Sequence, residues 1–182
     1  MSLETRVVTK NNKNNAEMLM RNAFPKNEHV PMWILLKGNK SEDISFLEFY
    51  ENDNFVGFTY IISNQDITFI LFLAIDASMQ SQGYGSKVLT YIRNLYPNNR
   101  MVLQMQSVDK TKENYEQRLK RQKFYFRNGY QNIGYKFDMH GEVNEVLVHG
   151  DITVTKKEYY NMFKKLFGKV IMIFLNPKFI DM

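Results

Sequence analysis

An almost wholly apolar segment, Thr68–Ile75, runs into a glycine-containing loop and then into a segment with helical periodicity. A strand that is buried on both faces has such a continuous apolar sequence. The loop spans Gln80–Gly85, and the apolar residues after it recur at helical spacing: Val88, Leu89, Ile92 and Leu95. A strand, a tight loop and a helix in direct succession predict a mixed α/β fold in which helices pack on a sheet.

The rest of the chain continues this mixture of strands and helices. Ile44–Tyr50 and Phe55–Ile62 are rich in β-branched and aromatic residues and flank a polar turn, so they predict a hairpin. Further strands are predicted at Met101–Gln106, Tyr130–Met139, Val143–His149 and Lys169–Leu175. Helices are predicted at Ala16–Phe24, Val30–Leu36, Thr111–Asn128 and Thr155–Phe167, the last with a capping box of Thr155 and Glu158 and an end at Gly168.

Length and composition are those of a globular domain. The chain has 182 residues, of which 44% are hydrophobic and 24% charged, enough to bury a substantial core. We therefore expect a single domain over residues 1–182, completed by a helix and a strand within residues 150–182. The longest apolar runs are too short to span a bilayer and the N-terminus lacks the pattern of a signal peptide, so we expect a cytoplasmic protein without a membrane partner.

The absence of cysteine removes several kinds of site. Without cysteine the chain has no disulfide framework, no thiolate zinc site and no cysteine nucleophile. The three histidines, His29, His140 and His149, do not stand at metal-ligand spacing to one another. We therefore expect no metal site.

The loop Gln80–Gly85 has the chemistry of an anion-binding site. Glycine permits a sharp turn and a close approach of backbone to ligand. The N–H groups in the first turn of a helix lack internal partners, and the helix dipole is positive there, so the two together bind phosphate. The loop is neither a P-loop nor the three-glycine dinucleotide fingerprint. From two glycines alone, a plain strand-to-helix turn remains the alternative.

Four motifs in order resemble those of the GNAT N-acetyltransferases. They are Phe55-Val56-Gly57-Phe58 (family pattern iVGf), Leu73-Ala74-Ile75-Asp76 (lAVd), Gln80-Ser81-Gln82-Gly83-Tyr84-Gly85 (Gln/Arg-x-x-Gly-x-Gly/Ala) and Phe124-Tyr125-Phe126-Arg127-Asn128-Gly129-Tyr130 (FYxxxGF). The segment from Asn114 to Arg121 resembles a bacterial subgroup of this family without a settled substrate. The resemblance implies a mixed central sheet flanked by helices, with splayed parallel strands holding CoA.

The resemblance also implies a binding mode for acetyl-CoA as the acyl donor. The pantetheine arm would pair with the backbone at the end of the strand Thr68–Ile75, and the main-chain amides of the loop would hold the pyrophosphate. Side chains at Ser81, Gln82 and Tyr84 could then vary, whereas Gly83 and Gly85 could not. The expected cofactor-binding residues are Leu73, Ala74, Ile75, Gln80, Ser81, Gln82, Gly83, Tyr84, Gly85, Ser86, Tyr125 and Arg127.

Tyr125 matches the family's tyrosine beside the thioester sulfur, which implies a role as general acid. A phenol can donate that proton, although an aromatic core residue is the alternative interpretation. Arg127 either reaches a CoA phosphate or faces the C-terminal end of the helix dipole.

The general base is the least defined part of the expected site. An amine with a pKa near 10.4 must lose a proton before it attacks. Related sequences often carry Glu at the end of the strand that matches Met101–Gln106, and Gln106 cannot titrate. Asp76 is the first candidate base and Glu48 the second, but Asp76 could instead cap a turn.

Three functions remain open at this point. The first is transfer of acetyl to a small-molecule or peptide amine by direct attack, because no cysteine, and no serine paired with histidine in a motif, offers an acyl-enzyme. The second is an acyl-CoA sensor without turnover, which Gln106 favours. The third, ranked last, is nucleic-acid binding through the basic residues of 110–127, for which a solvated helix face is the commoner explanation. A homodimer is expected by family analogy.

Overall fold

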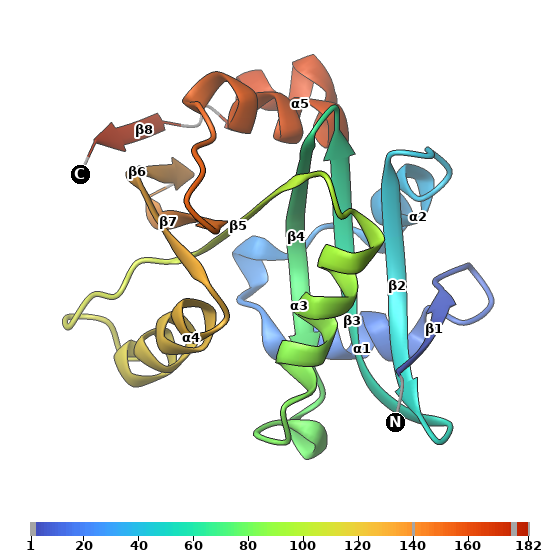
Figure 1. Cartoon of the computed structure of the whole chain (residues 1–182). Helices are drawn as coiled ribbons and strands as arrows, with labels where there is room; N and C mark the ends of the chain where they lie inside the picture. The colour runs from blue at the N-terminus through green and yellow to red at the C-terminus, as the bar shows by residue number, and fades with distance from the viewer. Residues whose placement is uncertain (1–2, 140, 176–177, 182) are drawn as a thin grey trace. The chain divides into compact units, whose positions relative to one another are not determined.

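The computed structural model describes residues 3–139, 141–175 and 178–181. Its eight strands form a mixed sheet with flanking helices, so the predicted α/β class is confirmed (Figure 1). The chain divides into two compact units, Met1–Ser63 with Ile70–Pro97 and Asn64–Phe69 with Asn98–Met182. The expectation of a single domain over residues 1–182 stays a prediction.

The first unit contains the strands and helices of the N-terminal half. They are β1 (Glu4–Val7), α1 (Asn14–Ala23), the 3-10 turn η1 (Lys26–Glu28), α2 (Met32–Gly38), β2 (Ile44–Glu51), β3 (Asn54–Asn64), the end of β4 (Ile67–Ile75), the 3-10 turn η2 (Ala77–Met79) and α3 (Tyr84–Leu95). The strand order is β1-β2-β3-β4, and β2 pairs antiparallel with both β1 and β3.

The predicted hairpin is confirmed, and its turn explains its register. The strands β2 and β3 pair up to Glu51 and Asn54, leaving a two-residue connection. Asn52 and Asp53 there have φ angles of 50° and 62°. Two-residue turns with positive φ at both positions match the twist of the strands they join, and Asn and Asp tolerate that conformation.

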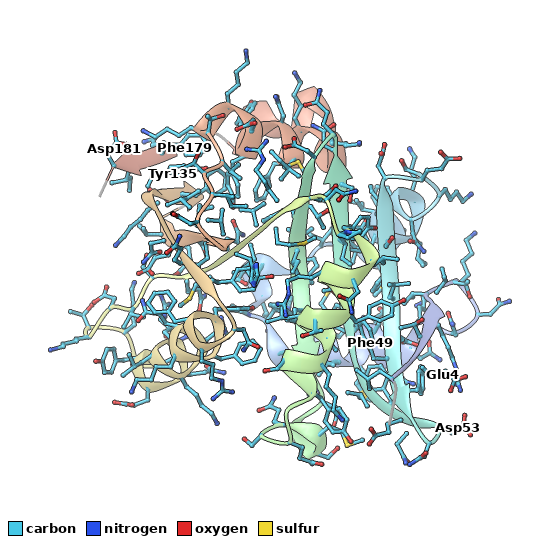
Figure 2. The ribbon with its side chains drawn as sticks, viewed as in Figure 1. Glu4, Phe49, Asp53, Tyr135, Phe179 and Asp181 are labelled. Carbon is cyan, nitrogen blue, oxygen red and sulfur yellow. The ribbon has the colours of Figure 1, made fainter. Side chains whose placement is uncertain are left out.

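Side chains of β2 alternate between two packed faces, as a strand requires. On one face, the ring of Phe46 lies 5.8 Å from Phe58 and 5.3 Å from Tyr60, whose hydroxyl donates to the Leu35 carbonyl of α2. On the other face, Phe49 meets Tyr91 of α3 edge to face at 5.5 Å (Figure 2). Figure 1 shows α3 in front of β3 and β4, and α1 and α2 behind β2 and β3.

The second unit contains the C-terminal half. Its elements are β5 (Arg100–Gln106), α4 (Tyr115–Arg127), β6 (Tyr130–Met139), β7 (Glu142–His149), α5 (Lys156–Leu175) and β8 (Lys178–Asp181), together with residues 67–69 at the start of β4. The strand order is β4-β5-β7-β6-β8. The pairs β5–β7, β7–β6 and β6–β8 are antiparallel.

Aromatic rings form the core of the second unit. Phe137 of β6 stacks on Phe163 of α5 at 5.0 Å, and Phe69 meets Tyr159 at 5.5 Å. Tyr135 and Phe179 lie side by side on β6 and β8 with their rings 5.5 Å apart (Figure 2). Such ring pairs stabilise the core beyond the apolar area they bury.

The C-terminal segment differs from its sequence-based prediction. Lys169–Leu175 was expected to be a strand, but α5 continues through Gly168 to Leu175, and the last described strand is β8. A short apolar run fits a strand or a buried helix equally well, and one glycine costs a helix only about 1 kcal/mol. The strand β1 was not predicted from the sequence.

Arg100 joins three segments of the second unit. Its guanidinium donates to both Asp66 carboxylate oxygens at 2.8 and 3.0 Å, to the Thr153 carbonyl at 2.8 Å and to Glu158 at 2.7 Å. Glu158 also accepts from the backbone N–H and hydroxyl of Thr155, the predicted capping box. The pKa of Glu158 falls from its ordinary 4.5 to about 2, mainly through Arg100 and then through Thr155.

Glu158→Gln should therefore lower stability more at neutral pH than at pH 3, where part of the contribution is already lost. A depressed pKa contributes stability above the ordinary value, and that contribution is lost as pH falls from about 4.5 through 2. Because Glu158 is partly exposed, the loss at pH 7 is about 1 kcal/mol, or about 3 °C in Tm. Calorimetric melts at pH 7 and pH 3, with the exposed Glu113→Gln as control, measure this difference. An equal Tm loss at both pH values would contradict the assignment.

Candidate active site

The loop after β4 holds its own shape through side-chain bonds to its backbone. Asp76 accepts from the Ser78 N–H at 3.0 Å and from the Ser78 hydroxyl at 2.6 Å, which caps η2. Gln80 Nε2 donates to the Ile75 carbonyl at 3.0 Å, and Gln82 Nε2 donates to the Ser78 carbonyl at 2.9 Å. These polar side chains therefore order the turn that leads into α3.

The start of α3 has the features of an anion site. Gly83 is the N-cap residue, with a φ of 84° that glycine adopts without strain. No described side chain caps this helix, and its first turn contains no acidic residue. A Cβ built on Gly83 would meet nothing within 4 Å. The backbone N–H groups of Tyr84, Gly85 and Ser86, which have no partner within a helix, fit a phosphate group.

Tyr84 has a role that the sequence analysis missed. Its side chain is buried, and its hydroxyl donates a short hydrogen bond to Glu51 at the end of β2. Lys87, one turn along α3, lies 3.5 Å from Glu51 and 4.7 Å from the Tyr84 ring centre. Tyr84 therefore anchors the first turn of α3 to β2. Nothing in the sequence connects positions 33 residues apart.

Gly57 fixes the close approach of β3 to the end of β4. A Cβ on Gly57 would lie 2.2 Å from the carbonyl oxygen of Ala74 and 3.0 Å from the Cα of Ile75. Just beyond, the Asp76 N–H donates to the Val56 carbonyl at 2.9 Å. Gly57 is part of the strand motif that resembles the family pattern, and the structure gives a steric reason for glycine at this position.

Tyr125 and Arg127 lie on α4 in the second unit. Tyr125 is buried, with ring centres 5.1 Å from Phe124 and 5.9 Å from Tyr130. Burial raises the pKa of its hydroxyl, and the Arg121 cation partly opposes that change. Arg127 is exposed, with its guanidinium 5.4 Å from the Phe124 ring centre.

The two candidate bases have structural partners. Asp76 caps η2, as described above. Glu48 is fully buried on β2, where its two oxygens accept from the Ala16 N–H at 3.1 Å and from the Tyr50 hydroxyl at 2.8 Å. Burial raises the pKa of Glu48, although these two hydrogen bonds oppose it. Gln106 is buried at the end of β5, 3.5 Å from the Asn114 amide.

The described residues were also compared with the requirements of metal, membrane and nucleic-acid sites. There, no three His, Cys, Asp or Glu side chains are grouped to hold a metal ion. His140 lies outside the described residues. No described helix is both long enough and apolar enough to cross a membrane. In the basic segment Arg118 is buried, while Lys120, Lys123 and Arg127 are exposed.

Comparison with known proteins identifies the family. The model of the acetyltransferase (GNAT) domain matches residues 42–132, which include the glycine loop and Tyr125. The chain therefore belongs to the GNAT acetyltransferases, a family of acyl-CoA-dependent transferases that act on acceptors of varied kind. A search of curated protein sequences finds no match.

Solved structures of this family share the fold at low sequence identity. A GNAT-family protein from Bacteroides thetaiotaomicron is 18% identical with a TM-score of 0.68, covering 92% of this chain and 97% of its own. The Escherichia coli ribosomal-protein-S18-alanine N-acetyltransferase is 12% identical with a TM-score of 0.61, covering 85% and 97%. The PaiA N-acetyltransferase from Thermoplasma acidophilum, in complex with coenzyme A, is 14% identical with a TM-score of 0.57, covering 83% and 100%.

Gly57→Ala should destabilise the protein by about 2 kcal/mol or more. The new methyl group would overlap with backbone atoms of Ala74 and Ile75, which cannot move aside by a change of rotamer. Gly83→Ala is the matched control, since its Cβ meets no atom and only the positive φ costs about 1–2 kcal/mol. Urea unfolding of both variants measures the two costs. Equal or smaller loss in Gly57→Ala would contradict a steric role for Gly57.

Proposed function

We propose that this chain is an acetyl-CoA-dependent N-acetyltransferase that transfers acetyl to an amine by direct attack. The observation that carries the proposal is the start of α3 in a GNAT domain. There Gly83 turns the backbone at positive φ, and a helix without a described side-chain cap or a first-turn acid presents its N–H groups. Acetyl-CoA would supply the activated thioester, and Gln80 through Ser86 would hold its pyrophosphate through main-chain amides.

The pantetheine arm is proposed to follow the backbone of Leu73, Ala74 and Ile75, as in the family. The coenzyme A complex of the Thermoplasma acidophilum relative supports this choice of ligand. The chain lacks cysteine, so an acyl-enzyme on cysteine cannot form. This supports transfer in one step.

Tyr125 is proposed as the general acid. A phenol is protonated at neutral pH, and burial raises the pKa of this hydroxyl further, so the proton donor is present there. The base is proposed to be Asp76, whose Oδ1 accepts from the Ser78 N–H and so caps η2. Glu48 is the second choice, because both of its oxygens are engaged.

The acceptor is proposed to be a small-molecule or peptide amine, and the protein to act in the cytoplasm. A sensor that binds acyl-CoA without turnover is the second candidate, and Gln106 is the observation that favours it, since an amide cannot serve as the base. Acetyl-CoA binding without release of free CoA in the presence of any amine would support the sensor.

Gly83→Glu should weaken acetyl-CoA binding at least about tenfold, equivalent to 1.4 kcal/mol, because a carboxylate at the N-terminus of α3 competes with the pyrophosphate. Gly83→Ala has the same backbone strain without the charge and should retain most of the affinity. Calorimetric titration of acetyl-CoA into the three proteins measures this. If both variants bind like the unchanged protein, the pyrophosphate does not lie on this loop.

Tyr125→Phe should lower kcat about 100-fold and leave acetyl-CoA affinity nearly unchanged, because only the proton donor is removed. Turnover is followed as free CoA released in the presence of an acceptor found by screening amines. Tyr115→Phe, at the start of the same helix, is the control. An unchanged kcat would remove Tyr125 from the catalytic machinery.

A further inference from the structure

The helix α4 has two buried side chains. Within Tyr115–Arg127, all of which the structure describes, the buried residues are Arg118 and Tyr125. They stand seven residues apart, which is about two helical turns, so they lie on one face about 10 Å apart along the axis. The position of the helix therefore depends on what these two side chains contact and on Gln122 between them, whose Nε2 donates to Glu145 of β7 at 3.1 Å.

Arg118 binds three different segments. Its Nε donates to Asn114 Oδ1 at 2.7 Å, and its Nη1 donates to the Ser107 carbonyl at 3.1 Å and to Glu142 Oε1 at 2.8 Å. Asn114 is the N-cap of α4, Ser107 follows β5, and Glu142 begins β7. One guanidinium thus ties the start of the helix to the ends of two strands.

This buried ion pair has a cost that an apolar contact would avoid. The Arg118 side chain is 6% exposed and that of Glu142 is 21% exposed. Removing two charges from water costs several kcal/mol per ion before their attraction offsets it, and apolar residues of similar size often give equal or greater stability. The planar guanidinium offers directional donors in fixed geometry, which neither lysine nor an apolar side chain can reproduce.

We propose that Arg118 is a positioning residue for Tyr125, an inference that rests on the proposed function. By fixing the start of α4 to Ser107 and Glu142, Arg118 prevents the helix from shifting on the strands, and the Tyr125 hydroxyl two turns later stays in one place. A displacement of about 1 Å at a catalytic group can cost about 100-fold in rate. Correct placement of the Tyr125 hydroxyl would therefore offset the cost of burying the ion pair.

The test removes the ion pair while keeping the fold. The double variant Arg118→Met/Glu142→Met replaces both charges by apolar side chains, a change that is often neutral in stability. Tyr125 ionisation is followed by NMR of protein labelled with [13Cζ]-tyrosine, and Tyr125→Phe assigns the signal. We expect the Tyr125 titration to move down toward the free-tyrosine value, because a loosened helix admits water to the hydroxyl. We expect kcat to fall at least about tenfold with acetyl-CoA affinity unchanged.

A second variant keeps the proposal testable if the double variant does not fold. Arg118→Lys retains a cation beside Glu142 but loses the fork that reaches Ser107 and Asn114, so the same downward shift is expected. An unchanged Tyr125 titration in either folded variant would overturn the positioning role. This NMR measurement needs no turnover, so failure to acetylate any amine would count against the proposed function and leave the role of Arg118 to be decided separately.

Discussion

The close approach of two backbones at Gly57 is the constraint on which the candidate binding site depends. Because no side chain separates β3 from the end of β4 there, the Asp76 N–H reaches the Val56 carbonyl at the point where β4 ends. Asp76 then caps η2, and the chain turns through Gly83 into α3. A side chain at position 57 would displace the strand end from which this whole connection starts.

Elements with strong local signals could be predicted from the sequence. The hairpin of β2 and β3, the apolar β4 and the helix after the glycines follow from residue type and spacing within a few positions. The prediction of a strand at Lys169–Leu175 was wrong, because a short apolar run by itself does not distinguish a helix from a strand. β1 was missed because four residues at the edge of a sheet have almost no pattern.

The site was predictable only where its determinants are local. Gly83 at the start of the helix can be read from adjacent residues. The fold alone brings together Tyr84 with Glu51 and the Ala16 N–H with Glu48. It likewise brings Arg118 to Ser107 and Glu142. Family resemblance supplied a role for Tyr125, which the sequence alone does not distinguish from a core aromatic residue, and that role stays a prediction.

The side-chain bonds of Asp76, Gln80 and Gln82 have a consequence for the thermodynamics of recognition. A loop that orders itself only around a ligand loses conformational entropy at the moment of binding, at about 0.5–1.5 kcal/mol for each side chain immobilised. Here the loop that leads into α3 is ordered by bonds between its own side chains and backbone. An anion bound at the proposed site would meet a loop that is already ordered, so the entropic cost of ordering it would fall on folding of the chain and not on association.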